Sequence, residues 1–104
     1  MKILAVTSCP SGVAHTYMAA TAIKKAAEAK GHNIKVETQG SIGVENEITM
    51  EDVKDADVIV LTKDVSINNT GRFEGKPIVK VAISDVVKKS DKIILKIEEA
   101  FKNR

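Results

Sequence analysis

The chain contains a single cysteine, Cys9, at the start of a short polar and glycine-containing loop (residues 9–12). A lone cysteine cannot form an internal disulfide, a CxxC redox pair or a cysteine-based metal cluster. If Cys9 takes part in chemistry, it acts as a single thiolate nucleophile. The loop leads into a predicted helix, whose first amides lack intrahelical partners and favour both a bound anion and a thiolate.

Several residues near Cys9 have properties suited to binding phosphate. Gly12 allows the backbone to approach a phosphate closely. The hydroxyls of Ser11 and Thr16 could donate hydrogen bonds, although both residue types are also ordinary helix caps. His15 could hold phosphate or move a proton, or could simply cap the helix. A nucleophile inside an anion cradle suits phosphoryl transfer through a phosphocysteine.

The rest of the chain alternates strand and helix patterns. Strands are predicted at residues 2–7, 33–38, 57–62 and 78–83, and helices at about 14–30, 50–56, 85–89 and 91–102. The first, third and fourth strands read as apolar and buried, whereas residues 33–38 alternate in polarity and read as an exposed edge strand. Residues 39–43 and 63–76 read as loops.

This alternation predicts an α/β fold of the Rossmann-like or flavodoxin-like kind. We expect one domain spanning residues 1–104, with a four-stranded, mainly parallel sheet of strand order 2-1-3-4 and helices on both faces. The topological switch point then lies at the carboxyl ends of the first and third strands. Cys9 follows the first strand at that place.

Composition narrows the class of protein. Hydrophobic residues make up 43% and charged residues 29%, with a formal net charge of +2. Lysines spread along the chain argue against a dedicated nucleic-acid binder. No apolar stretch is long enough to span a bilayer, and the N-terminus does not read as a signal peptide, so we expect a cytoplasmic protein. We expect no metal and no cofactor.

The run of residues 9–20, CPSGVAHTYMAA, resembles the phosphorylation-site signature of fructose-family enzyme IIB domains of the bacterial phosphoenolpyruvate-dependent sugar phosphotransferase system (PTS). That pattern is approximately C-P-T-G-I-A-H-T-F-M-A-A. Here Ser11, Val13 and Tyr17 are conservative replacements. Further similar segments lie at residues 36–41, 56–60, 64 and 72–77, so the resemblance covers residues 2–100.

The resemblance implies a mechanism and partners. A phosphohistidine of enzyme IIA donates its phosphoryl group to Cys9, the catalytic residue. The group then passes to fructose, or a related sugar, bound by a membrane-embedded enzyme IIC to which this chain docks, with a monomer as the default state. The residues expected to bind the phosphoryl group are Pro10, Ser11, Gly12, Val13, Ala14, His15 and Thr16.

Three further residues are candidates for accessory roles. Gln39 ends the second strand at the same edge of the sheet as Cys9 and could border the site. Asp64 could act as a general acid, although a solvated loop carboxylate is the more ordinary interpretation. Arg72 could contact phosphate or an acidic partner, although a lone arginine usually lies solvated on the surface.

Two other functions remain open on the residues alone. A small cysteine phosphatase would need an arginine to close the loop, and His15 occupies that position. A non-enzymatic binding module on a flavodoxin-like fold would not need the thiol.

Overall fold

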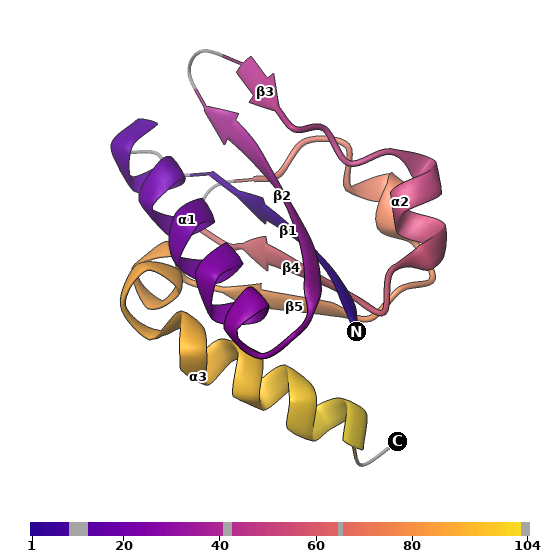
Figure 1. Ribbon diagram of the computed structural model, residues 1–104. Coiled ribbons are helices and arrows are strands. Elements are labelled where there is room, and N and C mark those ends of the chain that lie inside the picture. The colour runs from indigo at the N-terminus through magenta and orange to yellow at the C-terminus, as the bar shows by residue number, and fades with distance from the viewer. Residues whose placement is uncertain (9–12, 41–42, 65, 103–104) are drawn as a thin grey trace.

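A five-stranded sheet organises the computed structural model, which describes residues 1–8, 13–40, 43–64 and 66–102. The elements in chain order are β1 (Lys2–Thr7), α1 (Val13–Ala29), β2 (Asn33–Gly40), β3 (Gly43–Glu45), α2 (Met50–Asp55), β4 (Val58–Thr62), the 3-10 turn η1 (Thr70–Phe73), β5 (Ile78–Val81) and α3 (Ile83–Lys102). The sheet order is β3-β2-β1-β4-β5 (Figure 1). All neighbouring pairs are parallel except β2 and β3.

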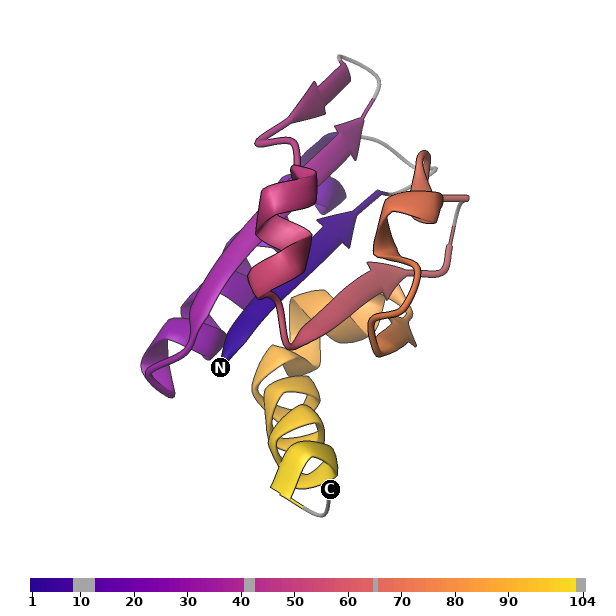
Figure 2. The same ribbon diagram turned by 90° about the vertical axis from the view of Figure 1, so that its right-hand side faces the viewer.

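Alternate residues of the central strands pack against two separate layers. Ile3 and Ala5 of β1 face a core formed with α1 and α3, whereas Leu4 and Val6 face a core formed with α2 and η1. Figure 2 shows α2 on one side of the sheet and α1 on the other. The continuous apolar runs of β1 and β4 follow from this arrangement, because both faces of these strands are covered.

Helix α1 connects β1 to β2 and packs closely on the sheet. Its buried stripe contains the small residues Ala19 and Ala27 on either side of Ile23, all three with no exposed surface. Gly31 ends the helix with a φ of +80°, a conformation that glycine adopts without strain. The amides of Gly31 and His32 donate to the carbonyls of the last helical turn, as in a Schellman motif.

The predicted strand order 2-1-3-4 is confirmed as β2-β1-β4-β5, but the sheet has one more strand than predicted. Part of the predicted loop 39–43 belongs to a hairpin, in which Gly40 pairs with Gly43 and Gln39 with Val44. The prediction that residues 33–38 form an exposed edge strand was therefore wrong. β3 covers the end of β2, where Glu37, Thr38 and Gln39 are buried.

Strand β5 also differs from its prediction. The sequence indicates a buried strand over residues 78–83, whereas β5 ends at Val81 and lies at the sheet edge. Ile78 is 42% exposed. An apolar run shows that a segment favours a strand, but only the topology decides which strand lies at the edge.

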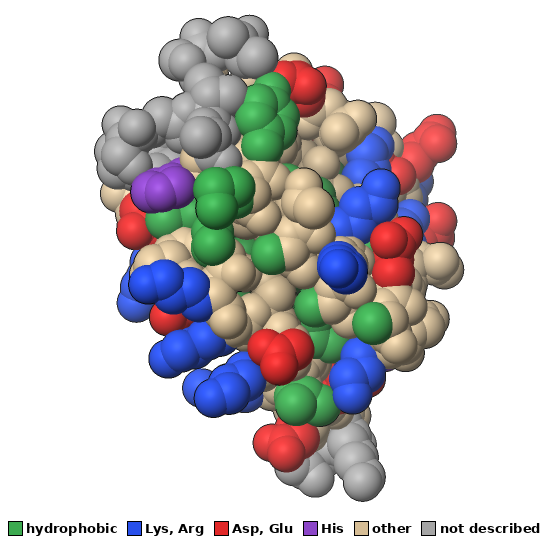
Figure 3. Space-filling model, turned by 60° about the vertical axis from the view of Figure 1, so that its left-hand side comes forward, with side chains coloured by type: hydrophobic (Ala, Val, Ile, Leu, Met, Phe, Trp, Pro, Cys, Tyr) green, Lys and Arg blue, Asp and Glu red, His purple; other side chains and the backbone are tan. Residues whose placement is uncertain are grey.

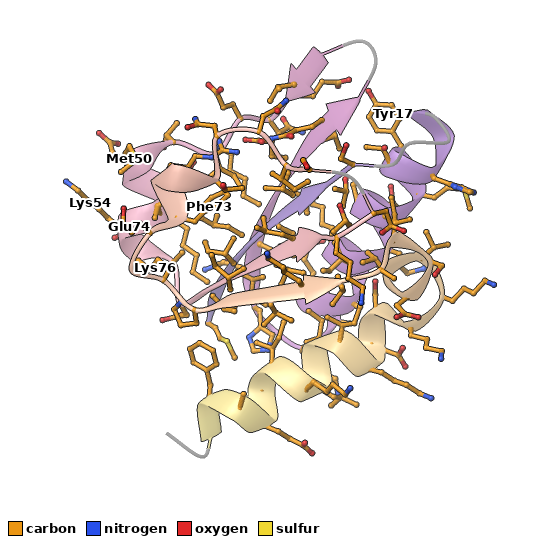
Figure 4. All side chains as sticks on the ribbon, turned by 180° about the vertical axis from the view of Figure 1, so that it is seen from behind. Tyr17, Met50, Lys54, Phe73, Glu74 and Lys76 are labelled. Carbon is orange, nitrogen blue, oxygen red and sulfur yellow. The ribbon has the colours of Figure 1, made fainter. Side chains whose placement is uncertain are left out.

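The two predicted C-terminal helices form α3, which is interrupted by non-helical dihedral angles at Lys89 (φ −136°, ψ 32°). This break coincides with the gap predicted between residues 89 and 91. The short helix α2 begins as predicted, with Thr49 and Asp52 forming a reciprocal capping box. Lys76 caps the C-terminal end of α2, because its amine donates to the carbonyls of Lys54 and Ala56 (Figure 4).

Ile59 and Ile78 are register partners in neighbouring strands, and they provide a matched test of this architecture. We expect Ile59→Ala to lower the free energy of unfolding by about 2–5 kcal/mol, because Ile59 is fully buried. We expect Ile78→Ala to change it by only about 0.5 kcal/mol. Urea titrations would measure both, and equal losses would contradict the edge position of β5.

Candidate phosphoryl-transfer site

The carboxyl ends of β1, β2 and β4 meet at one edge of the sheet, and Ser8 is held there from both sides. The Ser8 amide donates to the hydroxyl of Thr62 at 3.0 Å, and that hydroxyl donates back to the Ser8 carbonyl at 3.2 Å. The Ser8 hydroxyl donates to the carbonyl of Gln39 at 2.8 Å. The residue that precedes Cys9 in the chain is therefore fixed between β2 and β4.

The predicted loop residues are only partly described. Cys9, Pro10, Ser11 and Gly12 lie outside the described residues, and Val13 and Ala14 lie in the helical backbone of α1. His15 is exposed. Thr16 is buried, and its carbonyl accepts a 3.1 Å hydrogen bond from the hydroxyl of Thr7. This bond fixes the first turn of α1 to the end of β1.

Gln39 joins this edge of the sheet to the segment that follows β4. Its side-chain amide donates to the Asn68 carbonyl at 3.2 Å and accepts from the Asn68 amide at 2.9 Å. The Gln39 side chain thereby binds a stretch of backbone much as a neighbouring strand would. Its accessory role in the chemistry stays a prediction.

A buried ion pair lies beneath Gln39. Arg72 contacts Glu37 through both terminal nitrogens, at 2.7 and 2.6 Å, and it also donates to the Ile48 carbonyl at 2.9 Å. The two side chains are only 5% and 1% exposed. The prediction of a solvated surface arginine was therefore wrong. Sequence reasoning missed Glu37 altogether, although both residues fall inside segments that carry the family resemblance.

Opposing influences act on the pKa of Glu37. Burial raises it, because a carboxylate loses solvation away from water. The hydrogen bonds from Arg72, from the Ile48 amide and from Gln39 outweigh burial and hold the pKa of Glu37 below its ordinary value. The carboxyl group is therefore charged at neutral pH, and it neutralises the buried guanidinium.

Asp64 has a structural contact at the same edge. Its carboxylate accepts a 2.6 Å hydrogen bond from the Ile83 amide, at the start of α3. This bond caps the helix, and a carboxylate is favourable at a helix N-terminus. Beside it lies a pocket of about 430 Å³ whose lining includes Thr62, Asp64 and Ser66. A general acid role for Asp64 stays a prediction.

Tyr17, one of the replacements within the signature run, has a partner that its usual phenylalanine would lack. Its hydroxyl donates to the carboxylate of Glu45, joining α1 to β3 (Figure 4). That hydrogen bond is the main reason why the pKa of Tyr17 is raised. The replacement therefore adds a contact near the end of the sheet where Ser8 lies.

The described ranges contain neither a metal-binding cluster nor a membrane-spanning helix. No group of three or more His, Cys, Asp or Glu side chains there is arranged to hold a metal ion. No helix among the same residues combines the length and the apolar character needed to cross a membrane.

The fold and this edge of the sheet define a class of protein. The family model described as "PTS system, Lactose/Cellobiose specific IIB subunit" matches residues 4–96. The chain therefore belongs to the IIB family of the sugar phosphotransferase system.

Individual relatives agree with the fructose-type resemblance. The chain is 65% identical over 97 residues to the "PTS system fructose-like EIIB component 2" of Escherichia coli K12, covering 93% of this chain and 92% of that protein. It is 45% identical over 95 residues to the "Fructose-like PTS system EIIBC component" of the same organism, covering 89% of this chain and 20% of that protein. The solution structure of an E. coli K12 enzyme IIB subunit superposes with a TM-score of 0.92 at 36% identity, covering 98% of this chain and 94% of that one.

The buried ion pair leads to a test of stability. We expect Glu37→Gln to cost about 3–5 kcal/mol at neutral pH, because it leaves the Arg72 guanidinium buried and unpaired. Adding Arg72→Gln should cost less than the sum of the two single changes. Urea titrations of the four proteins would measure this coupling, and additive losses would contradict a direct pair.

The same pair predicts a pH dependence. Because the pKa of Glu37 is lower in the folded than in the unfolded chain, its contribution is complete above the ordinary value of 4.5 and is lost as the pH falls through the folded-state pKa. The stability difference between the parent and Glu37→Gln should therefore shrink below about pH 4.5. A difference that grew on acidification would contradict this assignment.

The Gln39 contact can be tested against a neighbouring change. We expect Gln39→Leu to cost about 1–3 kcal/mol and to speed hydrogen exchange at the Asn68 amide, because that amide loses its acceptor. Asn68→Ala is the matched control, since the contact uses only the backbone of Asn68. If both variants behave alike, the Gln39 side chain does not hold this segment.

Proposed function

We propose that the chain is a phosphocarrier in which Cys9 accepts a phosphoryl group from a phosphohistidine of enzyme IIA. Cys9 then passes the group to fructose, or a related sugar, bound by a membrane enzyme IIC. The observation that carries the proposal is the fixing of Ser8 between β2 and β4, at the end of β1. The peptide that leads to the thiol starts at the switch point of a parallel sheet, where such folds bind ligands.

Each half of the proposed reaction exchanges one bond to phosphorus. In the first, the Cys9 thiolate forms an S–P bond while the N–P bond of the donor breaks, and the electron pair returns to the imidazole nitrogen. In the second, a sugar hydroxyl forms an O–P bond while the S–P bond breaks, and the hydroxyl proton leaves to a base. The thiolate is regenerated, so the chain acts as a carrier.

The start of α1 supports this chemistry. The helix begins at Val13, four residues after Cys9, and its first amides and positive dipole end favour negative charge nearby. In the proposal, the amides of residues 11–16 spread the charge of the transferring phosphoryl group. His15, which is exposed in the same turn, is the residue proposed to hold phosphate or move a proton.

Transfer is favoured over hydrolysis by the position of Arg72. A cysteine phosphatase needs a guanidinium that clamps the phosphoryl oxygens. Both terminal nitrogens of Arg72 are engaged by Glu37 inside the protein, and the sequence's other arginine is Arg104, at the far end of the chain. The described residues therefore offer no guanidinium at this edge of the sheet.

The proposed partners are supported by the relatives. One relative matched over only 20% of its length is named as an EIIBC component, which places a B part and a C part in one protein. The comparisons name two classes of sugar. The family description names lactose and cellobiose, whereas the relatives are named fructose-like.

The carrier proposal is tested by intact mass. After incubation with a phosphorylated fructose-type enzyme IIA, we expect the parent to gain one phosphoryl group and Cys9→Ser to gain none. His15→Asn should still be phosphorylated, but more slowly. A parent that stays unmodified under conditions in which another IIB accepts phosphate would refute the carrier role, and release of phosphate from an aryl ester would favour the phosphatase.

A further inference from the structure

The exposed lysines are unevenly distributed over the protein. A groove of about 400 Å³ lies between the edge strand β5 and helix α3, and its lining contains five lysines and one acidic residue. The lysines are Lys63, Lys80, Lys89, Lys92 and Lys96, and the acidic residue is Asp85. Since the whole chain carries a net charge of only +2, this groove is far more basic than the rest of the surface. Figure 3 shows a group of basic side chains at the lower left of the view.

These five lysines lack the ion pairs that Lys2 and Lys35 form. Lys2 and Lys35 are both within 4.0 Å of the Asp52 carboxylate, and Lys76 donates to the carbonyls at the end of α2. Within the described part of the chain, none of the five groove lysines has such a partner. All five side chains are exposed, so their positive charges attract an anionic partner that approaches this face.

The groove begins at the edge of the sheet that carries the candidate site. Lys63 directly follows Thr62, whose hydroxyl holds Ser8. Asp64 caps α3, and Lys89, Lys92 and Lys96 of that helix all line the groove. The basic surface therefore extends from the proposed site along the side of the molecule.

We infer that this groove binds the anionic phospholipid surface of the membrane. The inference goes beyond the proposed function but relies on it in one respect, since the proposed sugar-binding partner lies in a membrane. A cluster of four to eight lysines is typical of surfaces attracted to anionic lipid headgroups. The loops of membrane proteins on the cytoplasmic side are themselves rich in Lys and Arg. Such loops would repel the basic face of this protein, whereas the anionic lipid headgroups around the loops would attract it.

Such binding would orient the protein as well as concentrate it. A flat negative surface against the β5–α3 face would hold the adjoining carboxyl edge of the sheet close to the headgroups. Each lysine near the surface contributes about 1 kcal/mol, so the attachment is reversible and depends on salt. A carrier that must meet two partners in turn needs an attachment of this weak and reversible kind.

The experiment is co-sedimentation of the full chain with vesicles of phosphatidylcholine alone, or of phosphatidylcholine mixed with phosphatidylglycerol. We expect binding only to the mixed vesicles at about 0.1 M salt, and its loss at about 1 M salt, where the Debye length falls to about 3 Å. The triple change Lys89→Gln, Lys92→Gln, Lys96→Gln should weaken binding by on the order of 100-fold.

The matched control removes three exposed lysines from other faces: Lys24→Gln, Lys25→Gln, Lys54→Gln. It makes the same change in net charge, and we expect it to weaken binding less than about threefold, because these lysines lie away from the groove. Circular dichroism would verify that both variants fold. Equal losses in the two triple variants, or no preference for the anionic vesicles, would overturn the inference.

Phosphorylation by enzyme IIA in solution separates this inference from the proposed function. We expect both triple variants to be phosphorylated at the rate of the parent when no vesicles are present. If the groove variant alone is phosphorylated slowly and no protein binds vesicles, the groove serves an acidic protein partner and the lipid assignment is refuted. Failure of the parent to accept phosphate would refute the carrier role but leave the vesicle result standing.

Discussion

Four hydrogen bonds converge on the carboxylate of Glu37, from Ile48, from Gln39 and twice from Arg72. They join β2 to the segment before α2 and to η1, which are far apart in the sequence. Gln39 extends the network to Asn68 through its side chain and to Ser8 through its carbonyl. Ser8, the last described residue before Cys9, thus bonds the backbone of the same residue, Gln39, whose side chain bonds the buried carboxylate.

A buried ion pair is a costly way to stabilise a protein, because both charges must leave water. The advantage of the ion pair here is that it fixes the relative orientation of the segments that it joins. An apolar cluster tolerates many arrangements, whereas the fork of Arg72 fits a carboxylate in one plane and fixes η1 against β2. The same contacts engage both terminal nitrogens of the Arg72 guanidinium with Glu37. In the proposed function, a phosphoryl group near the start of α1 is then stabilised mainly by backbone amides, which hold the group without the clamp that phosphatases use.

The parts of the fold that the sequence predicted are those set by local patterns. The apolar runs of β1 and β4 and the bounds of α1 and α2 all depend on residues close together in the chain. The hairpin strand β3, the exposure of β5 and the pairing of Arg72 depend on contacts between distant segments, so no local pattern contains them. The same distinction between local patterns and distant contacts applies to the candidate site. The residues around Cys9 could be singled out by type, but Glu37 and Thr62 support the site only through the sheet order.

The charged side chains are arranged differently near α2 and on the β5–α3 face. Asp52 is paired with Lys35, whose hydrogen bond is the main cause that lowers the pKa of Asp52 to about 2, and Lys2 lies between Asp52 and Asp55. Acidic and basic side chains thus neutralise one another near α2. Five lysines that have no such partner among the described residues line the β5–α3 groove, which adjoins the carboxyl edge of the sheet. The net charge of the chain is small, but positive charge is concentrated on the β5–α3 face. The electrostatic field of the protein therefore points outward from this face, which lies next to the end of β1. An incoming anionic surface would meet the molecule with that edge of the sheet turned toward it, which is the orientation that the proposed transfer to a membrane-bound acceptor requires.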